Sequence, residues 1–257
     1  MPVRLGGYEM IFPSTVRGFF IFFSTLLLGA QVQAQTASNE EIARALAQML
    51  QSARGVIGAH QDLINSAEPV EKGLTGDRVL AEAIEAFIAK GNPHPGSYSD
   101  ERLVRLLEAQ SSAIAEVMTE NQFAINREGV EFKGFVPAVF ARLVNERFAE
   151  KVGHEATIKV TAPPALVRNR KARPDPWELE VIEGYLMQES WPVGTPHEEI
   201  ADIGGREAYR MLMPEYYSEG CMACHGGPVG EIDITGYPKE GGQVGELGGV
   251  ISISLFR

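Results

Sequence analysis

The segment Val250-Ile-Ser-Ile-Ser-Leu-Phe256, near the carboxyl end of the chain, alternates strictly between apolar and polar residues over most of its length. Such alternation is typical of a β-strand with one face on a core, because successive side chains point to opposite faces of a sheet. Residues 156–161 and 208–213 show a similar alternation. We therefore predict an antiparallel sheet within residues 151–257.

Residues 35–150 carry a helical pattern instead. Ser38 followed by Glu41 is a helix-start signature, in which the serine caps the third amide and the glutamate reaches back. Apolar residues then recur at helical spacing as far as Ile64, and we expect this helix to end near Asn65. Further helices are predicted over 76–90, 99–125 and 136–151, with another beginning at Asp175. Helices followed by antiparallel strands are typical of an α+β fold.

The helical region contains an internal repeat. Residues 56–75 align with residues 117–136 at an offset of 61, without a gap and with six identities in twenty positions. Two copies are too few for a solenoid, so we interpret them as a duplicated helical hairpin; chance similarity between two amphipathic helices is the alternative. The identical pairs are Val56/Val117, Gln61/Gln122, Ile64/Ile125, Asn65/Asn126, Lys72/Lys133 and Gly73/Gly134.

Residues 1–34 have the layout of a secretory signal peptide. Arg4 and Arg17 precede an apolar stretch over 18–30, which is shorter than the roughly 20 residues that span a bilayer. Ala34 and the residue two positions earlier suit a cleavage site. An uncleaved single-pass anchor is the alternative. We expect an exported protein with no membrane attachment after cleavage, periplasmic if the source is a Gram-negative bacterium.

The charge balance narrows the range of partners. The chain has 257 residues, Lys+Arg 23, Asp+Glu 34 and a net charge of −11. An acidic protein of this kind is a poor match for nucleic acid or for an anionic membrane surface. A cationic redox partner protein suits it better. The sequence lacks the common phosphate-binding and hydrolase motifs, and it shows no distal acid–base pair of the kind a haem peroxidase needs. We therefore do not expect an enzyme.

Both cysteines of the chain lie in Cys221-Met-Ala-Cys224-His225. This is the attachment motif of c-type haem: two thiols three residues apart form thioethers with one porphyrin, and the adjacent histidine becomes the proximal iron ligand. A structural zinc site would need four ligands. A thioredoxin-like pair would open a helix, whereas Gly226-Gly-Pro228 follows here, and a disulfide between these positions would be strained. We predict one covalent haem c on Cys221 and Cys224, with His225 as ligand.

Several further stretches, together with this motif, resemble the exported monohaem c-type domains with a PAS-like fold, which occur as free proteins and as sensor modules of bacterial receptors. The resemblance covers about residues 110–257. It implies a PAS-like antiparallel sheet with flanking helices and one haem at its edge. The stretches are Phe132-Lys-Gly-Phe-Val-Pro-Ala-Val-Phe140, Arg168-Asn169, Pro174-Asp-Pro-Trp-Glu178, Glu215-Tyr-Tyr217, Cys221-Met-Ala-Cys-His-Gly226, Tyr237-Pro238 and Gly245-Glu-Leu-Gly-Gly-Val-Ile-Ser-Ile253.

Two departures from that family matter. Its Arg-Asn-Pro is Arg168-Asn169-Arg170 in this chain, so the local turn can differ. Some members use a cysteine thiolate as distal ligand, from a helix that precedes this motif. This chain has no third cysteine, so another group must serve or the distal position stays vacant.

His60 is our candidate for the distal ligand. It lies on the apolar stripe of the first helix, where a buried imidazole needs a partner. Iron is one such partner and a backbone carbonyl is the other. Met118 is the next candidate. The remaining histidines, His94, His154 and His197, occupy predicted loops or turns.

Other residues are expected to contact the haem without binding iron. Tyr216, Tyr217 and Met222 flank the attachment motif and are expected to pack on the macrocycle. Propionates need cationic hydrogen-bond donors, for which the candidates are Arg168, Arg170, Arg206 and Arg210. The sequence thus predicts an exported monohaem cytochrome that transfers electrons. The alternative is a redox or small-ligand (NO, CO or O2) sensor that acts through a partner protein.

Overall fold

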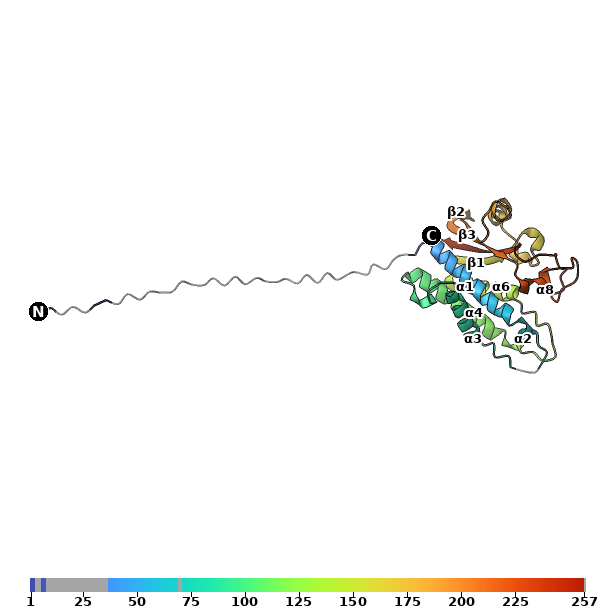
Figure 1. Ribbon diagram of the computed structural model, residues 1–257, viewed down its shortest axis with the longest axis horizontal. Helices are drawn as coiled ribbons and strands as arrows, with labels where there is room; N and C mark the ends of the chain where they lie inside the picture. The colour runs from blue at the N-terminus through green and yellow to red at the C-terminus, as the bar shows by residue number, and fades with distance from the viewer. Residues whose placement is uncertain (3–5, 8–36, 69–70, 257) are drawn as a thin grey trace. The chain divides into compact units, whose positions relative to one another are not determined.

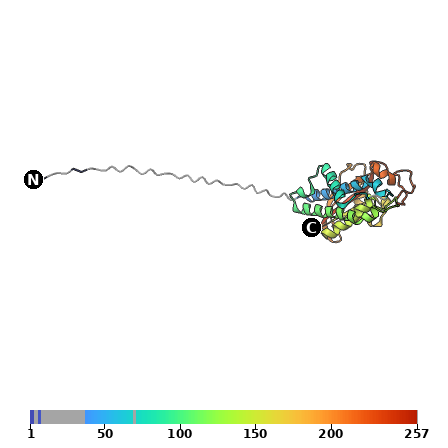
Figure 2. The ribbon, with the colours of Figure 1, turned by 90° about the horizontal axis from the view of Figure 1, so that it is seen from below.

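The computed structural model describes residues 1–2, 6–7, 37–68 and 71–256. Residues 34–257 group into one compact unit, in which helices α1, α3, α4 and α6 lie on one side of a sheet (Figure 1). Figure 2 shows these long helices alongside one another from below. The predicted signal peptide and its cleavage point after Ala34 lie outside the described residues, apart from residues 1–2 and 6–7. Among the described residues, no helix is long and apolar enough to cross a membrane.

Side-chain caps begin the long helices. Ser38 accepts a hydrogen bond from the Glu41 amide at 3.1 Å, and Asp100 accepts one from the Leu103 amide at 2.7 Å, which satisfies amides that have no partner within the helix. The first helix ends at Ala59, and a one-residue break separates it from the next. The helices are α1 (Asn39–Ala59), α2 (Gln61–Asn65), α3 (Gly76–Ala89), α4 (Glu101–Glu120), α5 (Gln122–Ile125) and α6 (Pro137–Val152).

The two copies of the repeat bind each other through equivalent residues. The side-chain oxygen of Asn65 accepts from the Lys133 amide at 3.3 Å, and that of Asn126 accepts from the Lys72 amide at 3.2 Å. Each side chain thereby ties the end of its own short helix to the loop of the other copy. An approximate two-fold relation between α1–α3 and α4–α6 follows from this exchange.

The glutamines of the two copies make a similar exchange. Gln61 donates to the Phe135 carbonyl at 3.3 Å, and Gln122 donates to the Leu74 carbonyl at 2.8 Å. The glycine of each copy has a positive φ, 63° at Gly73 and 69° at Gly134, a conformation that glycine adopts at little cost. The alignment at an offset of 61 therefore marks the residues that make the loops.

The sheet has the strand order β1-β4-β3-β2, and every neighbouring pair is antiparallel. On β4, Ile251 and Ile253 are buried against the helices together with Met211 of β3. Ser252 and Ser254 alternate with them. Both serines are also buried, so β4 is covered on both faces. The predicted α+β class is confirmed. The strands are β1 (Ala156–Thr161), β2 (His197–Ile203), β3 (Arg206–Tyr216) and β4 (Leu247–Phe256).

A second, smaller core holds α7 (Pro176–Val181) and the π-helical turn Ile182–Leu186 together with Leu212 and Val250 of the sheet. Asp175 caps α7 through a capping box with Glu178, as the sequence predicts. Arg210 of β3 is buried there, with its guanidinium 4.0 Å from the Trp177 ring centroid and 2.6 Å from the Asp175 carboxylate. This pair fixes α7 to the sheet.

Candidate functional site at the end of the central strands

The Cys-x-x-Cys-His segment lies where β3 ends and β4 begins. Tyr216 pairs with Leu247 after a register shift in the ladder, and the chain then turns through Glu219–Cys221 into the short helix α8 (Met222–His225). Figure 1 shows α8 at one end of the molecule, next to the connection that leads on to β4. Both cysteines are free and partly exposed.

The thiol of Cys224 is not an activated nucleophile. Burial and the negative charge of Asp233 raise the pKa of Cys224 above its ordinary value. Among the described residues, no three His, Cys, Asp or Glu side chains gather in a form suited to a metal ion.

The imidazole of His225 is held from one side. Its Nδ1 is hydrogen-bonded to the Glu240 carboxylate, and the Tyr217 ring stacks on it with centroids 5.1 Å apart. A carboxylate can only accept, so Nδ1 carries the proton, and in the neutral imidazole the lone pair then lies on Nε2. The described structure records no hydrogen bond at Nε2, and the side chain is 32% exposed. His225 therefore presents one unpaired nitrogen.

Glu240 receives three charged or polar donors. Besides His225, the Tyr217 hydroxyl donates to it at 2.8 Å and Arg168 donates at 2.8 Å. Burial alone would favour the neutral acid, but the hydrogen bonds from His225, Arg168 and Tyr217 outweigh it and lower the pKa of Glu240 to about 2. The carboxylate is thus ionised at neutral pH.

Arg168 joins three parts of the site. Its guanidinium bonds Asp233 at 2.6 Å, Glu240 at 2.8 Å and the Cys224 carbonyl at 2.8 Å. The Asp233 side chain is fully buried. Burial opposes its ionisation, yet hydrogen bonds from Thr235 and Arg168 hold the pKa of Asp233 well below its ordinary value. Arg168 thereby fastens the loop 226–246 to the cysteine segment.

Glycines make room for Tyr217. A Cβ atom on Gly242 would lie 2.5 Å from the Tyr217 ring, and one on Gly248 would lie 2.4 Å from it. The Gly242 amide also donates to the His225 carbonyl at 2.7 Å. The glycine-rich run before β4 therefore allows the aromatic ring that stacks on His225 to sit against backbone.

The propionate candidates have other partners in this structure. Arg168 is engaged as described, and Arg210 is buried against Trp177. Arg206 lies 4.1 Å from the Phe256 ring centroid and donates to the His154 carbonyl at 2.9 Å. Arg170 and Arg206 are the exposed residues among the four, and Arg168 and Arg210 are partly or fully buried. The Tyr216 hydroxyl accepts from the Gly194 amide at 3.0 Å, and Tyr217 is the tyrosine of the pair whose ring stacks on His225.

His60 occupies the break between α1 and α2 and is only partly buried. Its Nε2 lies 2.6 Å from the Glu82 carboxylate of α3, and its side chain is 22% exposed. Arg54, earlier on α1, is the residue that pairs with Glu215 at the end of β3. In this structure the hydrogen-bond partner of His60 is thus a carboxylate and not the backbone carbonyl that we considered. Its role as an iron ligand stays a prediction, and this placement does not favour it.

The other candidate ligands lie in varied surroundings. Met118 is fully buried in the helical core. His94 caps the Gly96 amide at 3.2 Å. His197 is not in an exposed loop, because it begins β2 and lies within 4.5 Å to 6.2 Å of three aromatic ring centroids, those of Trp177, Tyr185 and Trp191.

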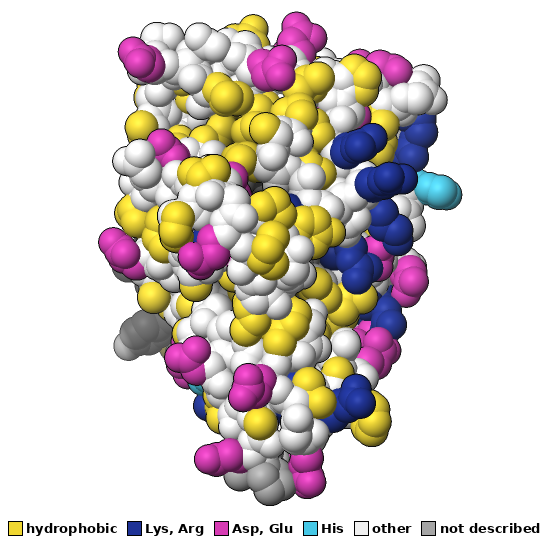
Figure 3. All heavy atoms as spheres, turned by 90° about the vertical axis from the view of Figure 1, so that its right-hand side faces the viewer, with side chains coloured by type: hydrophobic (Ala, Val, Ile, Leu, Met, Phe, Trp, Pro, Cys, Tyr) yellow, Lys and Arg dark blue, Asp and Glu magenta, His cyan; other side chains and the backbone are white. Residues whose placement is uncertain are grey.

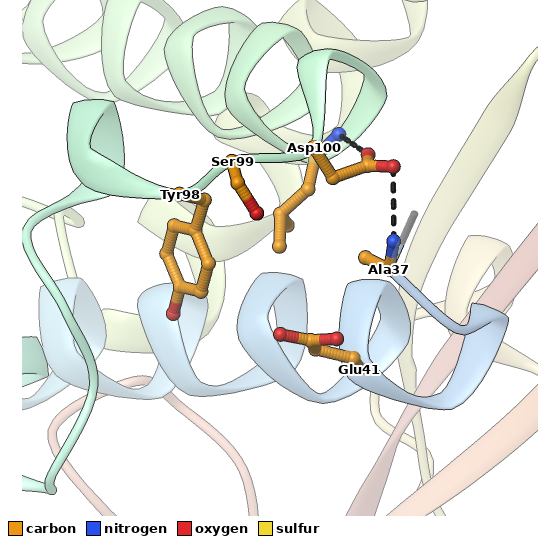
Figure 4. A pocket seen from close by; sticks show the side chains of 6 residues that line it. Ala37, Glu41, Tyr98, Ser99 and Asp100 are labelled. Carbon is orange, nitrogen blue, oxygen red and sulfur yellow. Dashed lines mark hydrogen bonds between the residues drawn. The ribbon is translucent and has the colours of Figure 1, made fainter. Parts of the chain in front are cut away.

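A cavity of about 120 Å³ lies far along the chain from the cysteine segment, between the start of α1 and the turn before α4. Figure 4 shows Glu41, Tyr98, Ser99 and Asp100 around it, with Asp100 bonded to the Ala37 amide. Asp100 also caps α4, so this cavity marks the point where Ala37, just before α1, is tied to the start of α4.

The fold and this geometry define an α+β protein that carries a Cys-x-x-Cys-His segment at the end of a four-stranded antiparallel sheet, with its histidine held by a carboxylate. The chain belongs to the Tll0287-like family, whose model matches residues 31–255. This is a cytochrome c-like family, and the match extends over the helical region as well as the sheet. No curated protein and no solved structure matches the chain.

Proposed function

We propose that this protein is an exported monohaem c-type cytochrome that transfers electrons through a haem bound to Cys221 and Cys224. The observation that carries the proposal is the state of His225. Its Nδ1 is committed to Glu240, and this is the arrangement that orients a metal-binding histidine in many proteins. The sheet with helices on both faces also supports the PAS-like form of the fold.

The surroundings of the motif fit a haem. Both thiols are free, and Nε2 of the next residue is unpaired. The loop 226–246 exposes five large apolar side chains, more than a solvated loop needs. Figure 3 views the molecule from this side and shows apolar side chains spread across the face. These exposed side chains are Val229, Ile232, Ile234, Tyr237 and Val244.

When bound, the haem supplies a one-electron couple between Fe(III) and Fe(II). The chain's own residues do the rest. Cys221 and Cys224 anchor the group covalently, so that it cannot be lost by dissociation after export. His225 offers its Nε2 lone pair, and Glu240 and Tyr217 fix the plane of its ring. The net charge of −11 favours a cationic partner for electron exchange.

The test is the spectrum of the protein matured in a host that attaches c-type haem. We expect haem that survives denaturing electrophoresis in the wild type and is lost in the Cys221→Ala/Cys224→Ala double variant. A ferrous low-spin spectrum that CO leaves unchanged would show two protein ligands on the iron and support electron transfer. Covalent haem in the double variant, or none in the wild type, would refute the proposal. A spectrum that CO converts would show an open distal position and put the sensor alternative first.

A further inference from the structure

The ion-pair cluster beside His225 has an excess of negative charge. Arg168 contacts two acids, Asp233 and Glu240, so one positive charge faces two negative charges. Asp233 is fully buried and Glu240 is 18% exposed. The cluster therefore keeps a net charge of −1 in direct hydrogen-bond contact with the imidazole.

The donors on Glu240 are divided between its two oxygens. Arg168 binds Oε2, while His225 and Tyr217 share Oε1. The oxygen that faces the imidazole is thus the one that the guanidinium leaves free. The Tyr217 ring, stacked at 27° to the imidazole, keeps the ring in the plane that this hydrogen bond needs.

A carboxylate on Nδ1 has two consequences for a metal on Nε2. It fixes the tautomer, and it makes the imidazole a stronger electron donor. A stronger donor and a nearby negative charge both stabilise Fe(III) relative to Fe(II), because the oxidised iron carries one more positive charge. Both effects lower the reduction potential.

We propose that Glu240 is a positioning residue that fixes the tautomer of His225 and sets a low reduction potential at the iron. This inference rests on the proposed function, since it concerns the same ligand. Arg168 holds Glu240 in place, and Tyr217 moderates its effect by drawing charge from the oxygen that faces His225.

The experiment is a redox titration of the haem-loaded protein and its Glu240→Gln variant. We expect the equilibrium between Fe(II) and Fe(III) to move at least tenfold toward Fe(II), which is about +59 mV for a one-electron couple. Glu231→Gln is the matched control. Glu231 lies on the same loop and is exposed, and its side chain bonds only Lys239 among the described residues, at 2.6 Å. Its removal takes away the same charge and should move the potential far less.

Tyr217→Phe is expected to shift the reduction potential in the opposite direction. The hydroxyl is lost while the ring keeps its place between Gly242 and Gly248, so Glu240 should bind His225 more strongly and the potential should fall. A role in packing alone would not give shifts of opposite sign in the two variants.

Nitrogen-15 NMR of the haem-free protein tests the tautomer directly, and it remains informative if Glu240→Gln accepts haem poorly. We expect His225 protonated at Nδ1 in the wild type and a mixture of tautomers in the variant. Covalent haem with a potential that Glu240→Gln and Glu231→Gln move equally, or with an unchanged tautomer, would overturn the inference. A wild type without covalent haem would overturn the proposed function instead.

Discussion

The substitution Arg168→Ala removes the guanidinium that bonds Asp233, Glu240 and the Cys224 carbonyl at once. The side chain is mostly buried, with 21% of its surface exposed. Its loss leaves two ionised carboxylates in a partly buried site without a cation. Both acids keep some neutral or histidine donors, so the expected result is a strained but folded loop.

The size of the effect follows from the carboxylates. Although burial opposes ionisation, hydrogen bonds lower the pKa of Glu240 from 4.5 to about 2, which corresponds to about 3 kcal/mol at roughly 1.4 kcal/mol per pKa unit. Arg168 supplies part of this, and the fully buried Asp233 depends on it as well. Removing one partner of a buried ion pair costs roughly 3–5 kcal/mol. We expect the free energy of unfolding at pH 7 to fall by an amount in that range.

The two carboxylates also determine how the stability cost of Arg168→Ala changes with pH. Glu240 and Asp233 have pKa values below their ordinary ones in the folded protein. Their stabilising contribution is therefore present above the unfolded pKa near 4 and is lost as the pH falls through the folded values, which for Glu240 is about 2. In Arg168→Ala the carboxylates lose their cation and protonate more readily, so acid relieves the penalty. The gap between variant and wild type should narrow between pH 7 and pH 3.

The assay is urea unfolding followed by circular dichroism at pH 7, 4 and 3. Arg170→Ala is the matched control, since Arg170 is an exposed arginine on the same segment. Arg168→Lys should fall between the two, because an ammonium cannot reproduce the forked contact with both acids. The reasoning is refuted if Arg168→Ala costs no more than Arg170→Ala, or if the gap is the same at every pH.

Three further predictions concern the repeat, the glycines beside the Tyr217 ring, and His60. Asn65→Ala and Asn126→Ala should each lower the free energy of unfolding by about 1 kcal/mol in chemical denaturation, and costs that differ severalfold would contradict the two-fold relation. Gly248→Ala should lower the free energy of unfolding by about 1–3 kcal/mol by crowding the Tyr217 ring, and it should alter the haem spectrum. An unchanged Tm and spectrum would show that a glycine is not needed at position 248. His60→Ala should leave the ferrous spectrum as in the wild type, because its Nε2 is paired with Glu82; loss of a low-spin spectrum would restore it as the distal ligand.

The sequence predicts the parts of the fold in which spacing has a local cause. Alternation in β4 follows from one face being buried against the helices. Ser38 and Asp175 mark helix starts because a cap acts within three residues of itself. The identities of the repeat were informative for a less local reason: Asn65 and Asn126 each hold the loop of the other copy.

The partners of the site could not be predicted in this way. Glu240 lies 72 residues from Arg168 along the chain, and Asp233 lies 65 residues from it. Both acids stand in a glycine-rich loop without periodicity, so no spacing links them to His225. His60 shows the converse limit. Its apolar spacing continues the pattern of α1, but helical periodicity gives no sign that the helix breaks there and exposes the imidazole to Glu82.

The position of β3 bears on the choice between carrier and sensor. This strand sends Met211 and Met213 into the helical core, pairs Glu215 with Arg54 of α1, and then leads through Tyr217 to His225. A sensor needs an element with two arrangements that the ligand can bias. In the strand order β1-β4-β3-β2, β3 is hydrogen-bonded on both edges, so a shift of β3 would break two ladders at once. A strand fixed in this way would hold His225 still, and this favours the proposed electron transfer over signalling through the sheet.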